Sequence, residues 1–301
     1  MATQIEKSKL EISNGKYCDC PTNHINCLTA KEWILSQIGV WKFSYESRDI
    51  RDKDIHPATF PISLPKRCIE LFTHAGELVV DPFSGSGSTL LAAQDCDRNC
   101  VGFDLKPEYM NVCKSRLSTQ EQKSQQIPLC EDARNANKHL DENSINLIVT
   151  SPPYANLLNR PRTNKSRRGK LRQNDQYLKI EQYSQDKNDL GVLDLDQYQF
   201  AMTEIFRDLL PLLKEKAHCV INVPDVWMDN KRMTIHISVV KALTDAGYEL
   251  RNTIIWDRTN IVNRIGIFGW PSNYITMGTT FEYILDFWRP PSTSSQTNIP
   301  V

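Results

Sequence analysis

Short apolar stretches alternate with longer amphipathic stretches along the chain from residue 77 onward. Seven stretches are rich in β-branched or aromatic residues and predict strands at 78–80, 101–103, 127–130, 145–150, 218–223, 250–256 and 283–287. The stretch 145–150 is almost wholly apolar, which is typical of a strand buried on both faces of a sheet. Strands that alternate with helical patterns are typical of βαβ units around a mainly parallel sheet.

Helical spacing of apolar residues predicts one helix before the first strand, at 64–72, and others between the strands, at 88–95, 198–213 and 235–246, with a further helix from Pro107. In 198–213 the apolar residues recur at 198, 202, 205, 209, 212 and 213, so one face of this helix should pack on the sheet. Gly247 supplies a stop signal for the last helix. The pattern predicts an α/β fold with a mostly parallel seven-stranded sheet and helices on both faces.

The composition fits one large domain, because 301 residues with 40% hydrophobic content can bury a substantial core. We expect an N-terminal extension at 1–50, the α/β domain at 51–289 and a disordered tail at 290–301. The first ten residues lack the apolar core of a signal peptide, and no apolar stretch is long enough to span a membrane. We therefore expect a soluble cytoplasmic protein without membrane contact.

The nine cysteines are scattered among the periodic segments, which favours reduced thiols over a disulfide framework. Four of them are expected to fill the core: Cys68, Cys96, Cys113 and Cys219. A second group lies close together near the N-terminus and includes soft ligands that zinc could use: Cys18, Cys20, His24 and Cys27. A Cys-x-Cys pair is less diagnostic than paired Cys-x-x-Cys, and a turn without a ligand is the alternative, so we assign no metal from the sequence.

The segment 81–87 reads Asp-Pro-Phe-Ser-Gly-Ser-Gly and lies between a predicted strand and a predicted helix. In an α/β sheet such a loop opens the ligand crevice at the carboxyl end of the strand. Gly85 and Gly87 have no Cβ, so the backbone can approach a ligand, and the helix that follows offers free N–H groups. Asp104 ends the next predicted strand, where a carboxylate can accept hydrogen bonds from both ribose hydroxyls of a nucleoside cofactor. The Gly-x-Gly-x-x-Gly fingerprint of dinucleotide sites does not occur here.

The segment Thr150-Ser151-Pro152-Pro153-Tyr154 directly follows the predicted buried strand. The two prolines fix φ and lack N–H groups, so this turn should be rigid, with carbonyl oxygens free to accept hydrogen bonds. An exocyclic amine can donate one hydrogen bond to the Ser151 hydroxyl and another to the Pro152 carbonyl, which biases its nitrogen toward tetrahedral geometry. Tyr154 offers a flat face on which an extruded base can stack.

Both segments resemble motifs of the S-adenosylmethionine-dependent DNA amino-methyltransferases, which modify N4 of cytosine or N6 of adenine. The resemblance implies S-adenosylmethionine as the cofactor and a Rossmann-like methyltransferase fold. It implies that the loop holds the methionine part of the cofactor through Asp81, Phe83, Ser84, Gly85 and Gly87. By the same resemblance Asp104 holds the ribose and Asp132 lies near the adenine amine, although an ordinary surface role for Asp132 is the alternative. Phe60 lies in a stretch that resembles the cover of the methionine end, and its ring could face the sulfonium.

The Thr-Ser-Pro-Pro-Tyr form resembles the N4-cytosine enzymes, which implies catalytic roles for Ser151, Pro152, Pro153 and Tyr154. We therefore expect site-specific methylation of the N4 amine of a flipped cytosine. N6-adenine methylation is the nearest alternative, followed by an RNA or protein amine methyltransferase and by a nucleic-acid-binding protein without activity. No cysteine directly follows a proline, which excludes the covalent route of cytosine C5 methylation.

The cofactor loop precedes the tetrapeptide, whereas many related enzymes have the reverse order, so the resemblance implies a circularly permuted arrangement over 28–289. A basic stretch within 156–190 is expected to contact double-stranded DNA, although such a run is also typical of a solvated surface. Its cations are Arg160, Arg162, Lys165, Arg167, Arg168, Lys170 and Arg172. The loop 258–274 is a second candidate for reading the target. Because the formal net charge is zero, attraction to DNA must come from such local clusters. A cognate restriction endonuclease is a functional partner to consider, without a stable complex.

Overall fold

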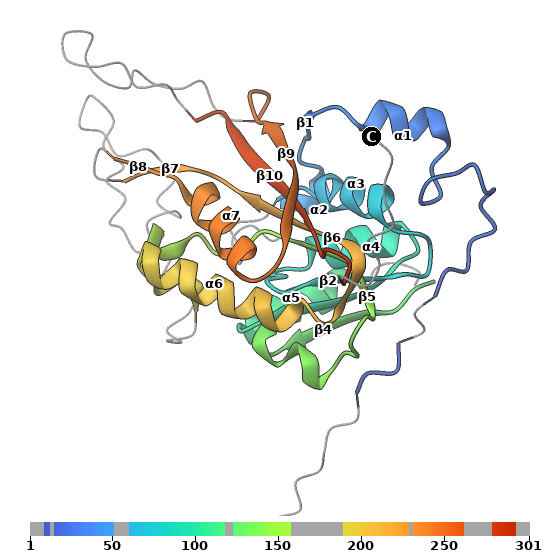
Figure 1. The fold of residues 1–301 in the computed structure, drawn as a ribbon, viewed down its shortest axis with the longest axis horizontal. Helices are drawn as coiled ribbons and strands as arrows, with labels where there is room; N and C mark the ends of the chain where they lie inside the picture. Colours follow the sequence, from blue (N-terminus) through green and yellow to red (C-terminus); the bar gives the residue numbers. More distant parts are fainter. Residues whose placement is uncertain are drawn as a thin grey trace, which may run out of the picture.

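The computed structural model describes residues 9–12, 15–50, 60–117, 123–157, 189–228, 231–261 and 279–292. An eight-stranded sheet lies at its centre, in the order β1-β9-β10-β6-β5-β2-β3-β4 (Figure 1). Its strands are β1 (Val40–Lys42), β2 (Leu78–Asp81), β3 (Asn99–Asp104), β4 (Gln126–Cys130), β5 (Ile145–Thr150), β6 (Leu213–Val223), β9 (Glu249–Asp257) and β10 (Phe281–Trp288). A separate small sheet pairs β7 (Val226–Met228) with β8 (Lys231–Met233).

Within the described sheet, β10 is the strand that runs against the others. It pairs antiparallel with both β6 and β9, and the remaining five pairings are parallel. From β2 the chain proceeds outward through β3 and β4, and it then returns to the other side of β2 to form β5 and β6. The order of the strands therefore reverses between β2 and β5, which is where α/β sheets open a crevice at their carboxyl ends.

The seven strands expected from the sequence are present, but the expected number was wrong because β1 adds an eighth at the edge. Residues Val40–Lys42 pair in parallel with β9, and the pairing places Trp41 opposite Trp256. Trp41 is 2% exposed, whereas Val40 and Lys42 on either side face outward. A strand with one inward side chain is too short for its alternation to be recognised in the sequence.

Helices cover both faces of the sheet, as expected. They are α1 (Ala30–Ser36), α2 (Ser47–Ile50), α3 (Ser63–Phe72), α4 (Ser88–Asp95), α5 (Pro107–Leu117), α6 (Leu195–Leu209) and α7 (Ile235–Asp245), with short helices η1 (Ala133–Lys138), η2 (Ala155–Leu157) and η4 (Leu190–Val192). α6 and α7 lie on one side of the strands, and α3 and α4 lie on the other (Figure 1). No described helix is both long enough and apolar enough to cross a bilayer.

The core consists of two layers, because successive residues of a strand point to opposite faces. In β2, Leu78 and Val80 join the layer beneath α6 and α7, whereas Val79 joins the layer beneath α3 and α4. The four cysteines expected in the core are all buried: Cys68, Cys96, Cys113 and Cys219. This double burial explains why β2 and β5 are mostly apolar rather than alternating.

The start of α6 is fixed by a local capping motif, whereas its end could not be located from the spacing of apolar residues. Asp194 caps its first turn by accepting a hydrogen bond from Gln197 N (2.8 Å), and the Gln197 side chain accepts one in return from Asp194 N. The helix ends at Leu209, earlier than expected, and Leu213 already pairs with Ile145 as part of β6. The predicted helix 198–213 was too long because Leu212 and Leu213 continue the helical spacing of apolar residues.

Candidate active site

A cleft of about 870 Å³, measured to its open mouth, lies at the carboxyl ends of the central parallel strands. Its wall brings together the loop after β2, the ends of β3 and β4, and the turn after β5. The sequence-predicted residues that line it are Phe60, Phe83, Ser84, Gly85, Asp104, Asp132, Ser151, Pro152, Pro153 and Tyr154.

The loop after β2 is held in place by the end of β3. The backbone N–H and the hydroxyl of Ser84 both donate to the carbonyl of Phe103, at 2.9 and 3.1 Å. Gly102 leaves room for this contact, because a Cβ there would lie 2.8 Å from the Ser84 Cβ. The loop therefore curls over the strand ends with its backbone facing the cleft.

Asp104 is suited to binding two hydroxyl groups. Its Oδ2 accepts a hydrogen bond from Gly85 N and its Oδ1 accepts one from Lys106 N, both at 2.9 Å. A carboxylate has about four lone-pair sites, so each oxygen can accept a further hydrogen bond from a ligand in the cleft. Burial raises the pKa of Asp104 to about 6, although the N–H groups of Lys106 and Gly85 oppose this shift. The fixed, partly enclosed carboxylate fits the ribose of a nucleoside cofactor.

Asp81 differs from its expected role as a cofactor ligand, because it is 0% exposed and does not line the cleft. Its Oδ1 accepts hydrogen bonds from Phe83 N (3.0 Å) and the Thr150 hydroxyl (2.5 Å). Its Oδ2 accepts one from the Thr89 hydroxyl (2.5 Å). Burial raises its pKa to about 6, and the three donors oppose that shift. The carboxylate joins the loop after β2 to the residue just before Ser151, so its contacts point to positioning rather than ligand binding.

Gly87 also lies outside the lining of the cleft. It has φ +87°, and a Cβ at this position would lie 2.3 Å from the Cys113 Sγ atom of α5. The glycine is thus required by a left-handed backbone and by close packing on α5, rather than by the approach of a ligand. Gly85, with φ +50°, does line the cleft.

The turn after β5 carries a connected pair of hydroxyl groups. The Ser151 hydroxyl donates to the carbonyl of Asn222 on β6 (3.1 Å) and lies 2.7 Å from the Tyr154 hydroxyl. Because Ser151 has one hydroxyl hydrogen and uses it toward Asn222, Tyr154 is the donor in the second bond. The serine oxygen has a second lone pair, which can accept a hydrogen bond from a ligand in the cleft. Ala155, directly after the tyrosine, adopts φ +47°, a strained conformation that is common at functional sites.

A polar network continues behind Ser151. The side-chain amide of Asn222 donates to Glu282 on β10 (2.7 Å), and Glu282 forms an ion pair with Arg258. The Arg258 guanidinium also lies over the Trp256 ring, 4.9 Å from its centroid. Arg258 begins the loop 258–274, whose residues from 262 lie outside the described part of the chain. Its own side chain is engaged within the protein.

Several residues of the cleft were not anticipated from the sequence, among them Lys106, Tyr109, Glu131 and Asp189. The Lys106 ammonium lies 5.1 Å from the centroid of the Tyr109 ring, and both residues line the cleft together with Asp104. The sequence signal that could have identified Lys106 and Tyr109 is their position a few residues after Asp104, the acid that ends β3. Asp189 follows a long segment without periodic pattern, so no sequence signal could have placed it in the cleft.

Asp132, expected near the adenine amine, lines the cleft but is also occupied within the chain. Its Oδ1 accepts a hydrogen bond from Arg134 N (2.9 Å), and its Oδ2 is paired with the Arg134 guanidinium (2.7 Å). It thereby caps η1 at the end of β4. The remaining lone pairs of this carboxylate face the same cleft as Asp104.

The basic residues expected to contact DNA lie outside the described residues: Arg160, Arg162, Lys165, Arg167, Arg168, Lys170 and Arg172. The described chain stops at Leu157 in η2 and resumes at Asp189, just before η4. The two short helices are joined by a hydrogen bond from Asn156 N to Leu193 O (3.0 Å), and Tyr154, Asp189 and Leu190 all line the cleft. The described chain therefore stops and resumes close to the rim of the cleft.

Comparison with known proteins shows the family to which the chain belongs. A family model described as DNA methylase (N6_N4_Mtase) matches residues 6–115 and 145–300, which is most of the chain. The type II methyltransferase M.BglI of Bacillus subtilis is 36% identical over 95 residues, covering 31% of this chain and 26% of that protein. M.HindIII of Haemophilus influenzae is 41% identical over 66 residues, covering 22% and 21%. The chain thus matches about a quarter of the length of these curated relatives.

Among solved structures, TrmN from Thermus thermophilus matches with 15% sequence identity and a TM-score of 0.48. The match covers 80% of this chain and 53% of that one.

Proposed function

Because the chain belongs to the DNA methylase family, we propose that it transfers a methyl group from S-adenosylmethionine to the exocyclic N4 amine of a cytosine in double-stranded DNA. The observation that carries the proposal is the meeting of Asp104 and the Ser151–Tyr154 pair in one cleft. The first is suited to a nucleoside cofactor, and the second is suited to an aromatic amine. Both ligands must be adjacent for direct transfer.

When bound, S-adenosylmethionine would supply a methyl group on its sulfonium: the amine lone pair would form the N–C bond as the S–C bond breaks, S-adenosylhomocysteine would leave, and the surplus amine proton would pass to solvent. Asp104 would hold the ribose hydroxyls of the bound cofactor, and the backbone of the loop 82–86 would lie against the rest of it. Phe60 and Phe83 provide aromatic surface in the same wall, which favours a positively charged group. These residues fix the position of the methyl donor, while Asp81 and Gly87 hold the loop from behind.

The Ser151 hydroxyl binds the amine of the target base. Its hydrogen is directed to the carbonyl of Asn222, so its oxygen accepts one amine hydrogen while the Pro152 carbonyl accepts the other. Two acceptors in fixed positions draw the amine nitrogen out of conjugation with the ring, which makes its lone pair available. Tyr154 stacks on the base and, through its hydroxyl, orients Ser151. A base in this cleft has to be flipped out of the duplex.

We propose further that the basic stretch of 158–188 contacts DNA phosphates, since the chain on either side of it ends at the rim of the cleft. Lysine and arginine contacts to phosphates release counterions, so affinity for DNA should fall steeply as salt rises. Neutralising Arg167 and Arg168 should reduce this salt dependence without changing affinity for S-adenosylmethionine. The motif order, with the cofactor loop before the tetrapeptide, fits a permuted member of the family.

The decisive experiment digests methylated DNA to nucleosides and measures their masses after incubation with the purified chain and labelled S-adenosylmethionine. We expect N4-methylcytosine, whereas N6-methyladenine would move the target to adenine, and labelled RNA or protein in parallel reactions would move it to another substrate. Asp104→Ala should weaken cofactor binding, and Tyr154→Ala should lose turnover with cofactor affinity kept. Equal loss of cofactor affinity in both variants would contradict the assigned roles.

A further inference from the structure

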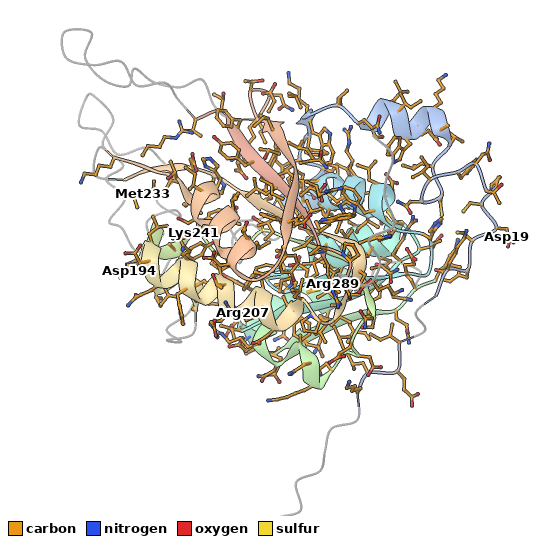
Figure 2. All side chains as sticks on the ribbon, viewed as in Figure 1. Asp19, Asp194, Arg207, Met233, Lys241 and Arg289 are labelled. Carbon is orange, nitrogen blue, oxygen red and sulfur yellow. The ribbon has the colours of Figure 1, made fainter. Side chains whose placement is uncertain are left out.

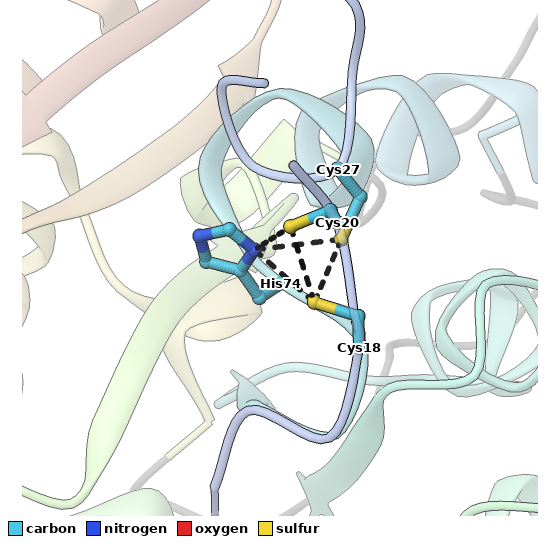
Figure 3. A group of neighbouring side chains, drawn as sticks. All are labelled: Cys18, Cys20, Cys27 and His74. Atoms are coloured by element: carbon cyan, nitrogen blue, oxygen red, sulfur yellow. Dashed lines mark hydrogen bonds between the residues drawn. The ribbon is translucent and has the colours of Figure 1, made fainter. Parts of the chain in front are cut away.

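Three cysteines and one histidine converge at a point far from the cleft. Cys18, Cys20 and Cys27 come from the N-terminal segment, and His74 comes from the loop between α3 and β2 (Figure 3). The four potential ligand atoms all lie within 4.8 Å of one another. The cluster includes the three cysteines singled out in the sequence, but its histidine is His74 and not His24.

We propose that Cys18, Cys20, Cys27 and His74 bind a structural zinc ion. The Sγ atom of Cys18 lies 3.4 Å from that of Cys20 and 3.3 Å from that of Cys27. In a regular tetrahedron with zinc–sulfur bonds of about 2.3 Å, sulfur atoms lie about 3.8 Å apart, so the cluster needs to expand by about half an ångström to admit the ion. A disulfide would require about 2.0 Å between the sulfurs. The spacing is therefore much closer to that of a tetrahedral zinc site than to that of a disulfide.

The position of the His74 ring supports a central ion rather than a set of hydrogen bonds. Its Nδ1 atom lies 3.4 Å from Cys18, 3.5 Å from Cys20 and 3.4 Å from Cys27. One imidazole lone pair cannot form three equivalent hydrogen bonds, but it points along the axis of the three sulfurs toward their common centre. Tetrahedral zinc geometry places sulfur and nitrogen ligands about 3.6 Å apart, in agreement with these distances.

The strained backbone at Cys27 fixes the direction of its side chain. Asn26 and Cys27 have φ +49° and +71° within a tight turn closed by two hydrogen bonds between Ile25 and Leu28, each 2.9 Å. Asparagine tolerates the left-handed region, but cysteine rarely adopts it, and such strain is typical of functional positions. The turn directs the Cys27 sulfur at His74 while Asn26 donates to the Leu71 carbonyl (2.6 Å).

The site is structural rather than catalytic, because its four protein ligands leave no open position for substrate. It lies at the amino end of β2, whereas the cleft lies at the carboxyl end. In Figure 2, Asp19, which stands between two of the cysteines, is on the opposite side of the molecule from Asp194, which follows the cleft-lining segment of η4. The ion would fasten residues 15–28 to the loop that introduces β2, beside the hydrogen bond from Tyr17 N to Ala75 O.

The test measures metal in the full chain, purified under reducing conditions without added chelator. We expect about one zinc ion per chain, retained in Cys130→Ser and His24→Gln and lost in Cys18→Ser and Cys27→Ser. His74→Cys should keep the ion as a four-cysteine site, which guards against variants that simply fail to fold. Cobalt substituted for zinc should give the absorption of a tetrahedral thiolate site.

A chelator should lower Tm and expose 15–28 to limited proteolysis, and added zinc should reverse both effects. Zinc below about a tenth of an equivalent, with no rise in Tm on adding it, would overturn the proposal. So would a bound iron centre, a disulfide among the three cysteines, or zinc lost equally from Cys130→Ser. None of these readouts depends on methyl transfer, so the outcome is independent of the proposed function.

Discussion

The hydrogen bond from Thr150 to Asp81 can be tested with a matched pair of variants. Thr150 and Thr89 are both buried, and each donates a hydrogen bond of 2.5 Å to the same buried carboxylate. Thr150 immediately precedes Ser151, whereas Thr89 belongs to α4. Replacing either by valine removes one hydroxyl and keeps the shape of the side chain. The two variants therefore remove equivalent interactions from different elements.

Thr150→Val and Thr89→Val should each lower the free energy of unfolding by about 1.5–3 kcal/mol, which is the usual contribution of a hydrogen bond to a charged group. Urea unfolding at pH 7.5 measures this loss. Turnover should separate the variants, because a shift of the Ser151 hydroxyl by about 1 Å costs roughly 100-fold in rate. We expect kcat to fall about 10- to 100-fold in Thr150→Val, with a smaller change in Thr89→Val.

Affinity for S-adenosylmethionine, measured by titration calorimetry, serves as the control, because neither threonine lines the cleft. It should change little in Thr150→Val. If both variants lose the same stability and the same turnover, the hydrogen bond is a general support of the core and does not position the catalytic turn. If Thr150→Val weakens cofactor binding as much as Asp104→Ala does, Asp81 acts in the cofactor site after all.

Three further predictions concern charge and packing. The folded-state pKa values of Asp81 and Asp104, about 6 against an ordinary 3.8, mean that protonation favours the folded state. The two charged carboxylates therefore destabilise the fold at pH values above about 6, and the free energy of unfolding should rise as pH falls from about 6 to about 4. Asp81→Asn should make the free energy of unfolding, measured in urea, depend less on pH over this range. Cofactor affinity should instead fall below about pH 6, as Asp104 gains a proton, and constant affinity down to pH 5 would contradict its role. Gly87→Ala should lower the free energy of unfolding by roughly 2–4 kcal/mol, because position 87 has a left-handed φ and an added Cβ would clash with Cys113. Gly39 has open space around it, so Gly39→Ala should unfold at the same denaturant concentration as the parent.

The parts of the fold that could be predicted are those fixed by local sequence and burial. The helix at 88–95 and the strand at 145–150 have the boundaries that their patterns indicate. β1 was missed because one inward tryptophan carries its signal, and the end of α6 was misplaced because the apolar spacing continued into β6. The spacing of apolar residues indicates which residues are buried, but it does not indicate where a helix ends and a strand begins.

Some residues of the candidate site could likewise be predicted from the sequence, and others could not. Asp104 and Ser151 could be found because each directly follows a predicted strand, and parallel strands bring their ends together. The burial of Asp81 could not be foreseen, since its partner Thr150 is 69 residues away along the chain. His74 is separated from Cys27 by 47 residues, so proximity in sequence pointed to the wrong histidine. Contacts over such separations depend on the assembled sheet.

The junction between η2 and η4 bears on how target choice can diverge within such enzymes. A backbone hydrogen bond from Asn156 N to Leu193 O joins η2 to η4, and β5 and α6 are the longer elements that precede and follow this junction. If residues 158–188 contact DNA as proposed, exchanging them between related chains at this junction should change the preferred DNA sequence and leave the turn 151–154 in place.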